Sequence, residues 1–257
     1  MNVLIVGATG ATGRLLTEQL LERGHSVKVI VRSPEKLPEA VRNHANLTII
    51  RAAVLDLSDA EMAQHVHGCD AVASCLGHNV TFKGMYGHPR KLVTDATRRL
   101  CQAIRANNPD KSTKFVLMNT DGNSNRDLNE PLAFAEKAIV GLLRHLLPPV
   151  ADNEQAADYL RTEVGQNDRL IEWTAVRPST LLDEATVTPY QLVPSPTESA
   201  LFGSRETSRI NVAHFMADLM TDEACWAQWK GQMPVIYNQA EAVASSQTDA
   251  SERPLLS

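Results

Sequence analysis

The hydrophobic positions of the chain fall into short apolar runs, separated by stretches in which apolar residues recur three and four positions apart. The short runs, rich in β-branched residues, are 3–6, 26–31, 47–51, 69–77, 114–119 and 171–181. Such runs are typical of buried β-strands, and the longer spacing is typical of amphipathic helices. Strands that alternate with helices predict an α/β fold with a doubly wound, mostly parallel sheet and helices on both faces.

The expected helices cover 15–21, 60–67, 91–106, 131–147, about 151–166, and 212–221. Pro148 and Pro149 separate two of them, because proline interrupts helical hydrogen bonding. Residues 183–206, rich in Pro, Ser and Thr, predict irregular chain in a small substrate-side region, before a last short strand at 233–238. The polar composition of 239–257 predicts a disordered tail, so we expect a single domain over 1–238.

Three glycines at intervals of three residues follow the first predicted strand. Gly7 permits a tight turn, Gly10 lets backbone N–H groups approach a pyrophosphate, and Gly13 allows close packing of helix and strand. The positive end of the following helix faces the anion. Strand, glycine turn and helix together predict a Rossmann dinucleotide site. The residues assigned to its loop are Gly7, Thr9, Gly10, Ala11, Thr12 and Gly13.

The spacing G-x-x-G-x-x-G resembles that of the atypical short-chain dehydrogenase/reductase superfamily. Within it, the chain resembles the NAD(P)H-binding group of NmrA-like regulators and biliverdin/flavin reductases. Asp70–Gly77 is similar to the group's D-a-V-x-x-x-L-G segment, and Trp173–Pro178 to its W-T-x-V-R-P segment. The resemblance covers about residues 1–238 and implies a Rossmann fold that binds NAD(P)H.

Arg32, at the end of the second predicted strand, distinguishes between the two cofactors. An acidic residue here would bind the ribose hydroxyls of NAD, whereas a guanidinium can grip the 2′-phosphate of NADP with two hydrogen bonds. Ser33 is expected to cap a helix that starts at Pro34, which brings Lys36 close enough to add a second charge. The resemblance implies the same phosphate role for both basic residues. The alternative is a solvated surface arginine.

The resemblance implies further contacts with the cofactor. Asp56 and Leu57 would border the adenine, although Leu55 replaces the group's usual glycine. The other implied cofactor residues are Cys75, Leu76, Gly77, Pro178, Ser179 and Thr180. Cys75 could be a nucleophile, but a small buried side chain is the commoner role of such a cysteine.

Asn119 and Thr120, at the end of the fifth predicted strand, are the candidate catalytic residues, because either can hydrogen-bond a substrate carbonyl. The superfamily's dehydrogenases carry Tyr-x-x-x-Lys on the next helix, where lysine lowers the pKa of the tyrosine. Here Tyr159 is followed four residues later by Glu163. We therefore expect no proton transfer from a Tyr–Lys pair.

Five other features complete the prediction. Loop 78–90 contains His78, Lys83, Tyr86, His88 and Arg90, and it is either a solvated loop or a lid that attracts an anionic substrate. Arg177 is expected to pair with an acidic residue, Trp173 to lie in the core, and Asn211 to cap a helix. His65 and His67 are two residues apart on a helix and are not expected to share a metal.

Composition narrows the function classes. The 257 residues carry a net charge of −5, which gives no basic field for direct binding of nucleic acid. Four scattered cysteines indicate a reducing cytoplasm, and we expect neither a targeting segment nor a membrane span. The best fit is an NADP(H)-dependent oxidoreductase acting on a small, conjugated or anionic substrate. The alternative is a non-catalytic, NmrA-like NADP sensor with a protein partner, and a sugar-nucleotide epimerase is weakened by the missing Tyr–Lys pair.

Overall fold

The computed structural model describes residues 1–78, 87–128, 130, 147–197, 203 and 205–239. Its main sheet has eight strands in the order β3-β2-β1-β4-β5-β6-β10-β8. The strands are β1 (Asn2–Val6), β2 (Ser26–Val31), β3 (Leu47–Arg51), β4 (Ala71–Ser74), β5 (Thr113–Met118), β6 (Ile171–Pro178), β8 (Tyr190–Val193) and β10 (Val235–Asn238). Only the β10–β8 pair is antiparallel, so the predicted doubly wound, mostly parallel sheet is confirmed.

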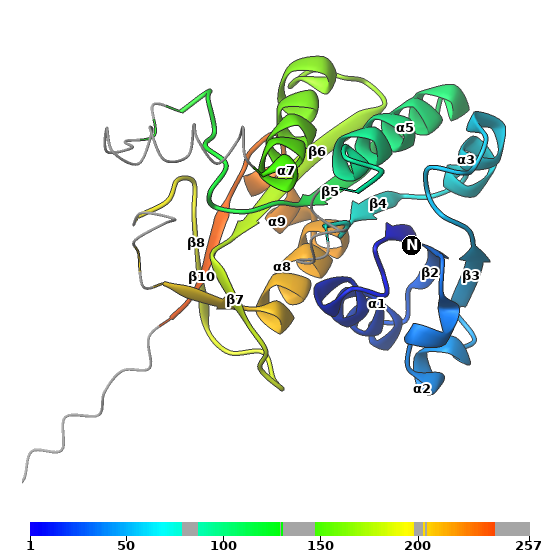
Figure 1. The fold of residues 1–257 in the computed structure, drawn as a ribbon, viewed down its shortest axis with the longest axis horizontal. Coiled ribbons are helices and arrows are strands. Elements are labelled where there is room, and N and C mark those ends of the chain that lie inside the picture. Colours follow the sequence, from blue (N-terminus) through cyan, green and yellow to red (C-terminus); the bar gives the residue numbers. More distant parts are fainter. Residues whose placement is uncertain (79–86, 129, 131–146, 198–202, 204, 240–257) are drawn as a thin grey trace, which may run out of the picture.

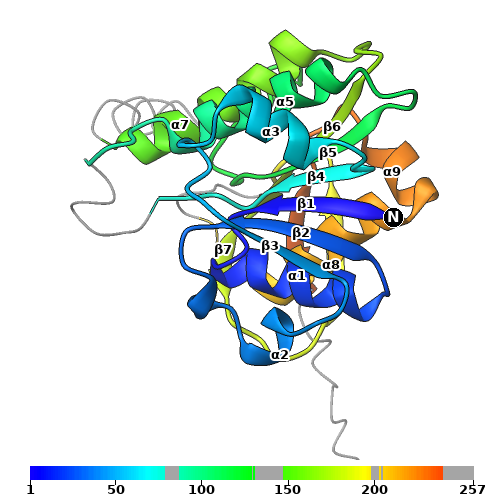
Figure 2. The ribbon, with the colours of Figure 1, turned by 90° about the vertical axis from the view of Figure 1, so that its right-hand side faces the viewer.

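Helices cover both faces of this sheet (Figures 1 and 2). One face carries α1 (Ala11–Glu22), α2 (Glu39–Arg42), α8 (Arg209–Thr221) and α9 (Glu223–Trp229). The other face carries α3 (Asp59–Val66), α5 (Leu92–Asn107) and α7 (Pro148–Tyr159), which continues as a π-helical turn over Leu160–Val164. Each face has its own apolar core, because alternate residues of the central strands point to opposite sides.

The burial of the strands explains why the hydrophobic pattern of the sequence predicted them. Val3 to Val6 of β1 are all fully buried, as expected for a central parallel strand covered on both faces. Ser58 caps α3: its hydroxyl accepts the N–H of Glu61 while the Glu61 carboxylate accepts the N–H of Ser58. Trp173 lies in the core as predicted, 1% exposed, and its indole N–H donates to the Gly165 carbonyl.

Several local predictions were wrong. Pro148 and Pro149 do not precede α7 but form its first turn, where the missing proline N–H groups cost nothing. Residues 183–206 are not wholly irregular, since they contain β8 and end in β9 (Glu206–Ser208), which pairs with β7 (Thr180–Leu182). Helix α9 was not anticipated. The expected helix at 131–147 lies almost wholly outside the described residues, as do most of the expected tail and Lys83 and Tyr86.

Asn211 is not a helix cap. Helix α8 begins two residues earlier, and the hydroxyl of Ser208 caps it by accepting the Asn211 N–H. The Asn211 side chain is fully buried, accepts the N–H of Thr188 at 2.9 Å and donates to the Asn238 side chain at 2.9 Å. Its role is therefore to join the chain before β8 to the end of β10.

No helix in the described part of the chain is both long enough and apolar enough to span a membrane.

Candidate cofactor and substrate site

The glycine loop joins β1 to α1 at the carboxyl edge of the sheet. Gly7 has a φ of +82°, and a Cβ there would lie 2.5 Å from the backbone carbonyl carbon of Cys75. A Cβ on Gly13 would overlap the carbonyl oxygen of Gly7, which also accepts the N–H of Gly10 at 3.0 Å. The backbone of this loop therefore requires glycine at two positions, for one positive φ and two close approaches.

Helix α1 begins with its N-terminus open to a ligand. Gly10 is its N-cap, no side chain caps the first turn, and no acidic residue lies in that turn. Gly10 and Ala11 are exposed, Thr9 is half-buried and Thr12 is buried. N–H groups left without a side-chain partner at the positive end of a helix fit the pyrophosphate of a dinucleotide.

Basic side chains gather at the ends of β2 and β3. Arg32 follows β2 and is exposed, and Lys36, also exposed, ends a single 3-10 turn over Pro34–Lys36. Ser33 makes no capping hydrogen bond to this turn, contrary to prediction. The sequence reasoning missed Arg51, which is exposed and lies opposite Val31 in the strand register. Its signal was a basic residue at the end of the strand next to β2. Glu35, in the same 3-10 turn as Lys36, places one negative charge next to these cations.

The turn after β3 is fixed by hydrogen bonds and an ion pair from a side chain of α5. The guanidinium of Arg99 on α5 donates to the carbonyl of Leu55 at 2.9 Å and to that of Leu57, and it pairs with Asp59 at 3.0 Å. Asp56 is exposed and Leu57 half-buried on this turn, so both remain available to a ligand. Their contact with adenine stays a prediction.

The segment Cys75–Gly77 leaves β4 beside the glycine loop. The Cys75 N–H donates to Val6 at 2.9 Å and extends the ladder, which places the next residues at the carboxyl edge. Burial raises the pKa of the Cys75 thiol to about 12. Because the thiolate is the reactive form, this half-buried cysteine is a poor nucleophile.

Asn119 and Thr120 end β5 at the same edge. Asn119 is 7% exposed, and its side chain donates to the Asn153 carbonyl at 3.0 Å and accepts the N–H of Thr120 at 2.8 Å. The side chain of Asn123 also donates to it. These contacts fix the loop after β5, so part of the amide is already used within the protein. Thr120 is half-buried, with its hydroxyl 3.5 Å from the Asp121 carboxylate.

Asp121 adds a carboxyl group to this edge. Burial raises its pKa, while the Ser179 hydroxyl and the positive charge of Arg177 act in the opposite direction. Ser179 donates to the Arg205 carbonyl at 2.9 Å. Pro178 is buried and Thr180 exposed beside it. The structure thus brings the residues predicted after β5 and β6 together, and their roles remain predictions.

Arg177 lies fully buried behind this edge. Its guanidinium pairs with Glu130 at 2.8 Å and donates to the carbonyls of Met233 at 2.6 Å, Asn123 at 2.9 Å and Pro194 at 3.0 Å. The predicted acidic partner is therefore Glu130. One side chain connects β6 to the segment that leads into β10 and to the segments that follow β5 and β8.

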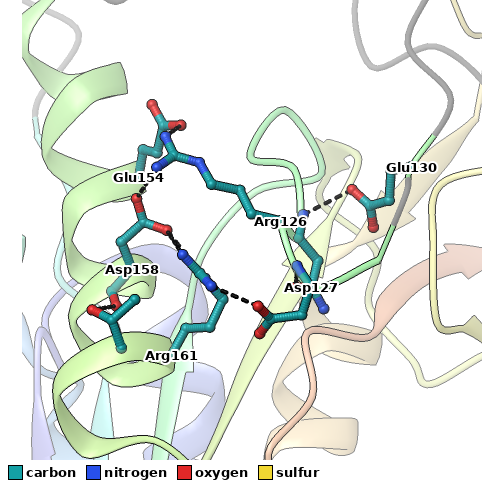
Figure 3. A network of polar contacts seen from close by, with 8 residues as sticks. Arg126, Asp127, Glu130, Glu154, Asp158 and Arg161 are labelled. Carbon is teal, nitrogen blue, oxygen red and sulfur yellow. Dashed lines mark hydrogen bonds and ion pairs between the residues drawn. The ribbon is translucent and has the colours of Figure 1, made fainter.

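Helix α7 carries carboxylates that pair with an arginine of the loop after β5 (Figure 3). Arg126 pairs with Glu154 at 2.7 Å and with Asp158 at 3.0 Å, and Arg161 pairs with Asp127 at 2.6 Å. Tyr159 packs against α5, where the Arg98 guanidinium lies 5.7 Å from its ring centre. The ion pairs of Arg126 and Asp127 attach the loop after β5 to α7 and the π-helical turn that continues it.

Within the described residues, no group of three or more His, Cys, Asp or Glu side chains is arranged to hold a metal.

The model of the NAD(P)H-binding family matches residues 7–223, and the chain belongs to this family. An uncharacterized chloroplastic protein of Arabidopsis thaliana is 44% identical over 119 residues, which are 46% of this chain and 41% of that protein. A 3-diazoavenalumate denitrifying reductase of Streptomyces is 34% identical over 107 residues, 41% of this chain and 34% of the reductase. The chain thus matches less than half the length of these relatives.

Solved structures share the fold over nearly the whole chain. An oxidoreductase from Lactococcus lactis has a TM-score of 0.65 at 20% identity, covering 93% of this chain and 91% of the other. A Rossmann-fold NAD(P)-binding protein from Shigella flexneri has a TM-score of 0.61 at 21% identity, covering 99% and 98%. A short-chain dehydrogenase/reductase from Veillonella parvula, solved with NADP, scores 0.64 at 18% identity, covering 91% and 93%. The chain is therefore an NAD(P)H-binding protein with a Rossmann-like α/β fold.

Proposed function

We propose that the protein is an NADPH-dependent reductase that acts on a small, conjugated or anionic substrate without a Tyr–Lys pair. The observation that carries the cofactor choice is the exposed Arg32 at the end of β2, with Lys36 and Arg51 at the same edge. Arg32 follows β2 directly, and Lys36 ends the 3-10 turn that comes next. Arg51 is the last residue of the neighbouring strand, β3. Such a cluster favours a ribose carrying a 2′-phosphate.

The bound cofactor supplies a hydride. The protein's residues orient the reactants and exclude water, and hydride delivery needs little else besides a proton source. The glycine loop and the N-terminus of α1 would hold the pyrophosphate, while Asn119, Thr120 and Asp121 present polar groups at the end of β5. The Streptomyces relative, a reductase by name, supports this class of reaction.

Replacing Arg32 by Ala tests the cofactor choice. A hydrogen bond to a charged group contributes about 1.5–3 kcal/mol, so the affinity for NADP should fall roughly 10- to 100-fold. The affinity for NAD, which lacks the phosphate, should change little. Calorimetry with both nucleotides measures the ratio, and Arg42→Ala, an exposed arginine at the end of α2, is the matched control. An unchanged NADP/NAD ratio would overturn the assignment.

Turnover is tested with saturating NADPH and a panel of quinones, flavins, biliverdins and carbonyl compounds. We expect oxidation of NADPH at 340 nm with at least one conjugated acceptor. Nucleotide binding without oxidation by any member of the panel would contradict the reductase.

The second candidate is a non-catalytic NADP sensor that binds a protein partner. The pairing of Glu154 and Asp158 with Arg126 favours it, because the charges of α7 are used to attach a loop. A sensor should retain a partner in pull-downs to different extents with NADP⁺, with NADPH and without nucleotide. Equal retention in all three conditions would contradict this function.

A further inference from the structure

The turn between β3 and α3, residues 52–58, is attached to helix α5 by one arginine. The Arg99 guanidinium donates to the carbonyl of Leu55 at 2.9 Å and, through its other terminal nitrogen, to that of Leu57. The same second nitrogen lies 3.0 Å from the Asp59 carboxylate at the start of α3. A single side chain, 19% exposed, therefore fixes two peptide groups of the turn and the first residue of the helix after it.

This β3–α3 turn has a buried side and an open side. Val54 is 7% exposed and lies in the apolar core under α5, and Leu55 and Leu57 pack against the same core. Asp56 lies between these two leucines and is exposed. The carbonyls that Arg99 binds thus belong to the two neighbours of the exposed carboxylate. The direction in which Asp56 points depends on how firmly these peptide groups are held.

The β3–α3 turn lies beside the part of the edge assigned to the ribose phosphate. The strand order β3-β2-β1 places the glycine loop after β1 and Arg32 after β2, and the turn follows β3. The Ala52 N–H donates at 3.1 Å to the carbonyl of Val31, the residue before Arg32. Pyrophosphate, ribose and adenine follow one another in the cofactor. A cofactor bound by the glycine loop and Arg32 therefore has its adenine at the β3–α3 turn.

We propose that Arg99 is a positioning residue for the adenine end of the cofactor; this inference rests on the cofactor placement in the proposed function. Arg99 acts through the turn and not by touching the nucleotide. It holds the peptide groups on both sides of Asp56, whose carboxylate accepts a hydrogen bond from the 6-amino group of adenine. A turn that is already ordered loses less backbone freedom when the nucleotide binds, so more of the interaction appears as affinity.

A purely structural role of Arg99 would be to pack α3 against α5. Another residue of α5 already joins these helices, because the Asn107 side chain donates to the Ala63 carbonyl on α3 at 2.8 Å. Weaker packing would lower the free energy of unfolding but would not change which base the protein prefers. Base preference is therefore the measurement that separates positioning from stability.

The first test compares NADP with its hypoxanthine analogue, in which a carbonyl oxygen replaces the 6-amino group of adenine. A carboxylate cannot accept a hydrogen bond from that oxygen, so calorimetry should show that the wild-type protein prefers NADP by about 10-fold. In Arg99→Ala, NADP affinity should fall roughly 10-fold and the preference for adenine should shrink to about threefold or less. Arg99→Lys keeps the charge but loses the planar fork, and it should give intermediate values.

Arg98→Ala is the matched control. Arg98 precedes Arg99 on α5, but its side chain is 48% exposed and pairs with Asp95 at 3.4 Å instead of the turn. Its affinities for both nucleotides should equal those of the wild type, and urea denaturation of every variant should show a folded protein. A wild-type protein that does not distinguish the two bases, or an Arg99→Ala variant that keeps the wild-type preference, would overturn the proposal.

The second test needs no variant. Hydrogen exchange of the wild-type protein is measured in peptides that cover 52–58. Adenosine 2′,5′-bisphosphate should slow the exchange of this turn, and nicotinamide mononucleotide, which lacks the adenine, should not. Equal exchange with and without the adenosine bisphosphate would overturn the placement of adenine at the turn. A preference for NAD, or a panel without turnover, would instead contradict the NADPH-dependent reductase. The base preference measured with NAD and its hypoxanthine analogue would then still decide the role of Arg99.

Discussion

The two halves of the carboxyl edge are built by different means. The half formed by β1, β2 and β4 is shaped by its backbone, through the φ of Gly7, the close approach of Gly13 to Gly7 and an uncapped α1. The half formed by β5, β6 and α7 is shaped by side chains far apart in sequence, such as Arg177 with Glu130 and Arg126 with Glu154. The first half therefore depends on a backbone shape that is local in the sequence, whereas the second depends on side-chain pairs between distant parts of the chain.

Arg177→Met should break the side-chain half most severely. Removing one partner of a buried ion pair leaves the other charge uncompensated and costs about 3–5 kcal/mol. Urea denaturation should show this loss of unfolding free energy. The double variant Arg177→Met/Glu130→Gln should lose less, because no buried charge is left alone. Equal losses in both variants would show that the carbonyl contacts of Arg177, rather than its charge pair, hold this half together.

Gly13→Ala should break the backbone half. The added methyl overlaps the Gly7 carbonyl, so the loop must move away from the position that its ligand needs. We expect a stability loss of roughly 1–3 kcal/mol, and NADP(H) affinity lowered beyond calorimetric detection. The control is Gly68→Ala, whose Cβ meets no atom within 4 Å although its φ of +71° adds backbone strain. Normal nucleotide binding by Gly13→Ala would contradict the close-packed loop.

Gly77→Ala tests whether the cofactor passes over the boundary between the two halves of the carboxyl edge. No atom lies within 4 Å of its added Cβ, so the unliganded fold should keep its stability. If the cofactor ribose passes against this residue as predicted, NADP(H) affinity should fall, by an amount that calorimetry measures. Unchanged affinity would place the ribose elsewhere along the edge.

Arg126→Ala should change the free energy of unfolding least among these variants that remove a contact. The Arg126 side chain is 51% exposed, and exposed ion pairs contribute about 0–1 kcal/mol. The loss should shrink further at high salt, which screens the two carboxylates. Denaturation at low and high ionic strength measures both values. A loss as large as that of Arg177→Met would mean that the Figure 3 contacts are as important to this half as the buried pair.

The same contrast explains what the sequence could predict. Runs such as Val3–Val6 and the 3.6-residue period of α5 report burial directly, so most of the strands and helices were placed within a few residues. β8 and α9 were missed because Pro and Ser around Tyr190 conceal a four-residue edge strand and because α9 has only seven residues. Asn211 looked like a cap in sequence, but its partners Thr188 and Asn238 are distant in the chain.

The candidate site was predictable to a similar extent. The glycines and Arg32 form a local pattern with a physical reason for each residue. The partners of His78 and Arg177 follow from neither spacing nor composition, because Asp152 and Glu130 meet them only after the sheet is assembled. Arg51 lies between these cases, since its closeness to β2 depends on the strand register.

The contacts of Arg126 also limit how this protein could be converted into a Tyr–Lys dehydrogenase. A lysine introduced at Glu154 would place an ammonium beside the guanidinium that now lies 2.7 Å from the carboxylate. Like charges at such a spacing repel, so that substitution is unfavourable until Arg126 has itself been replaced. The order in which residues change therefore matters as much as their number, and laboratory evolution that starts from Arg126 variants has the easier route.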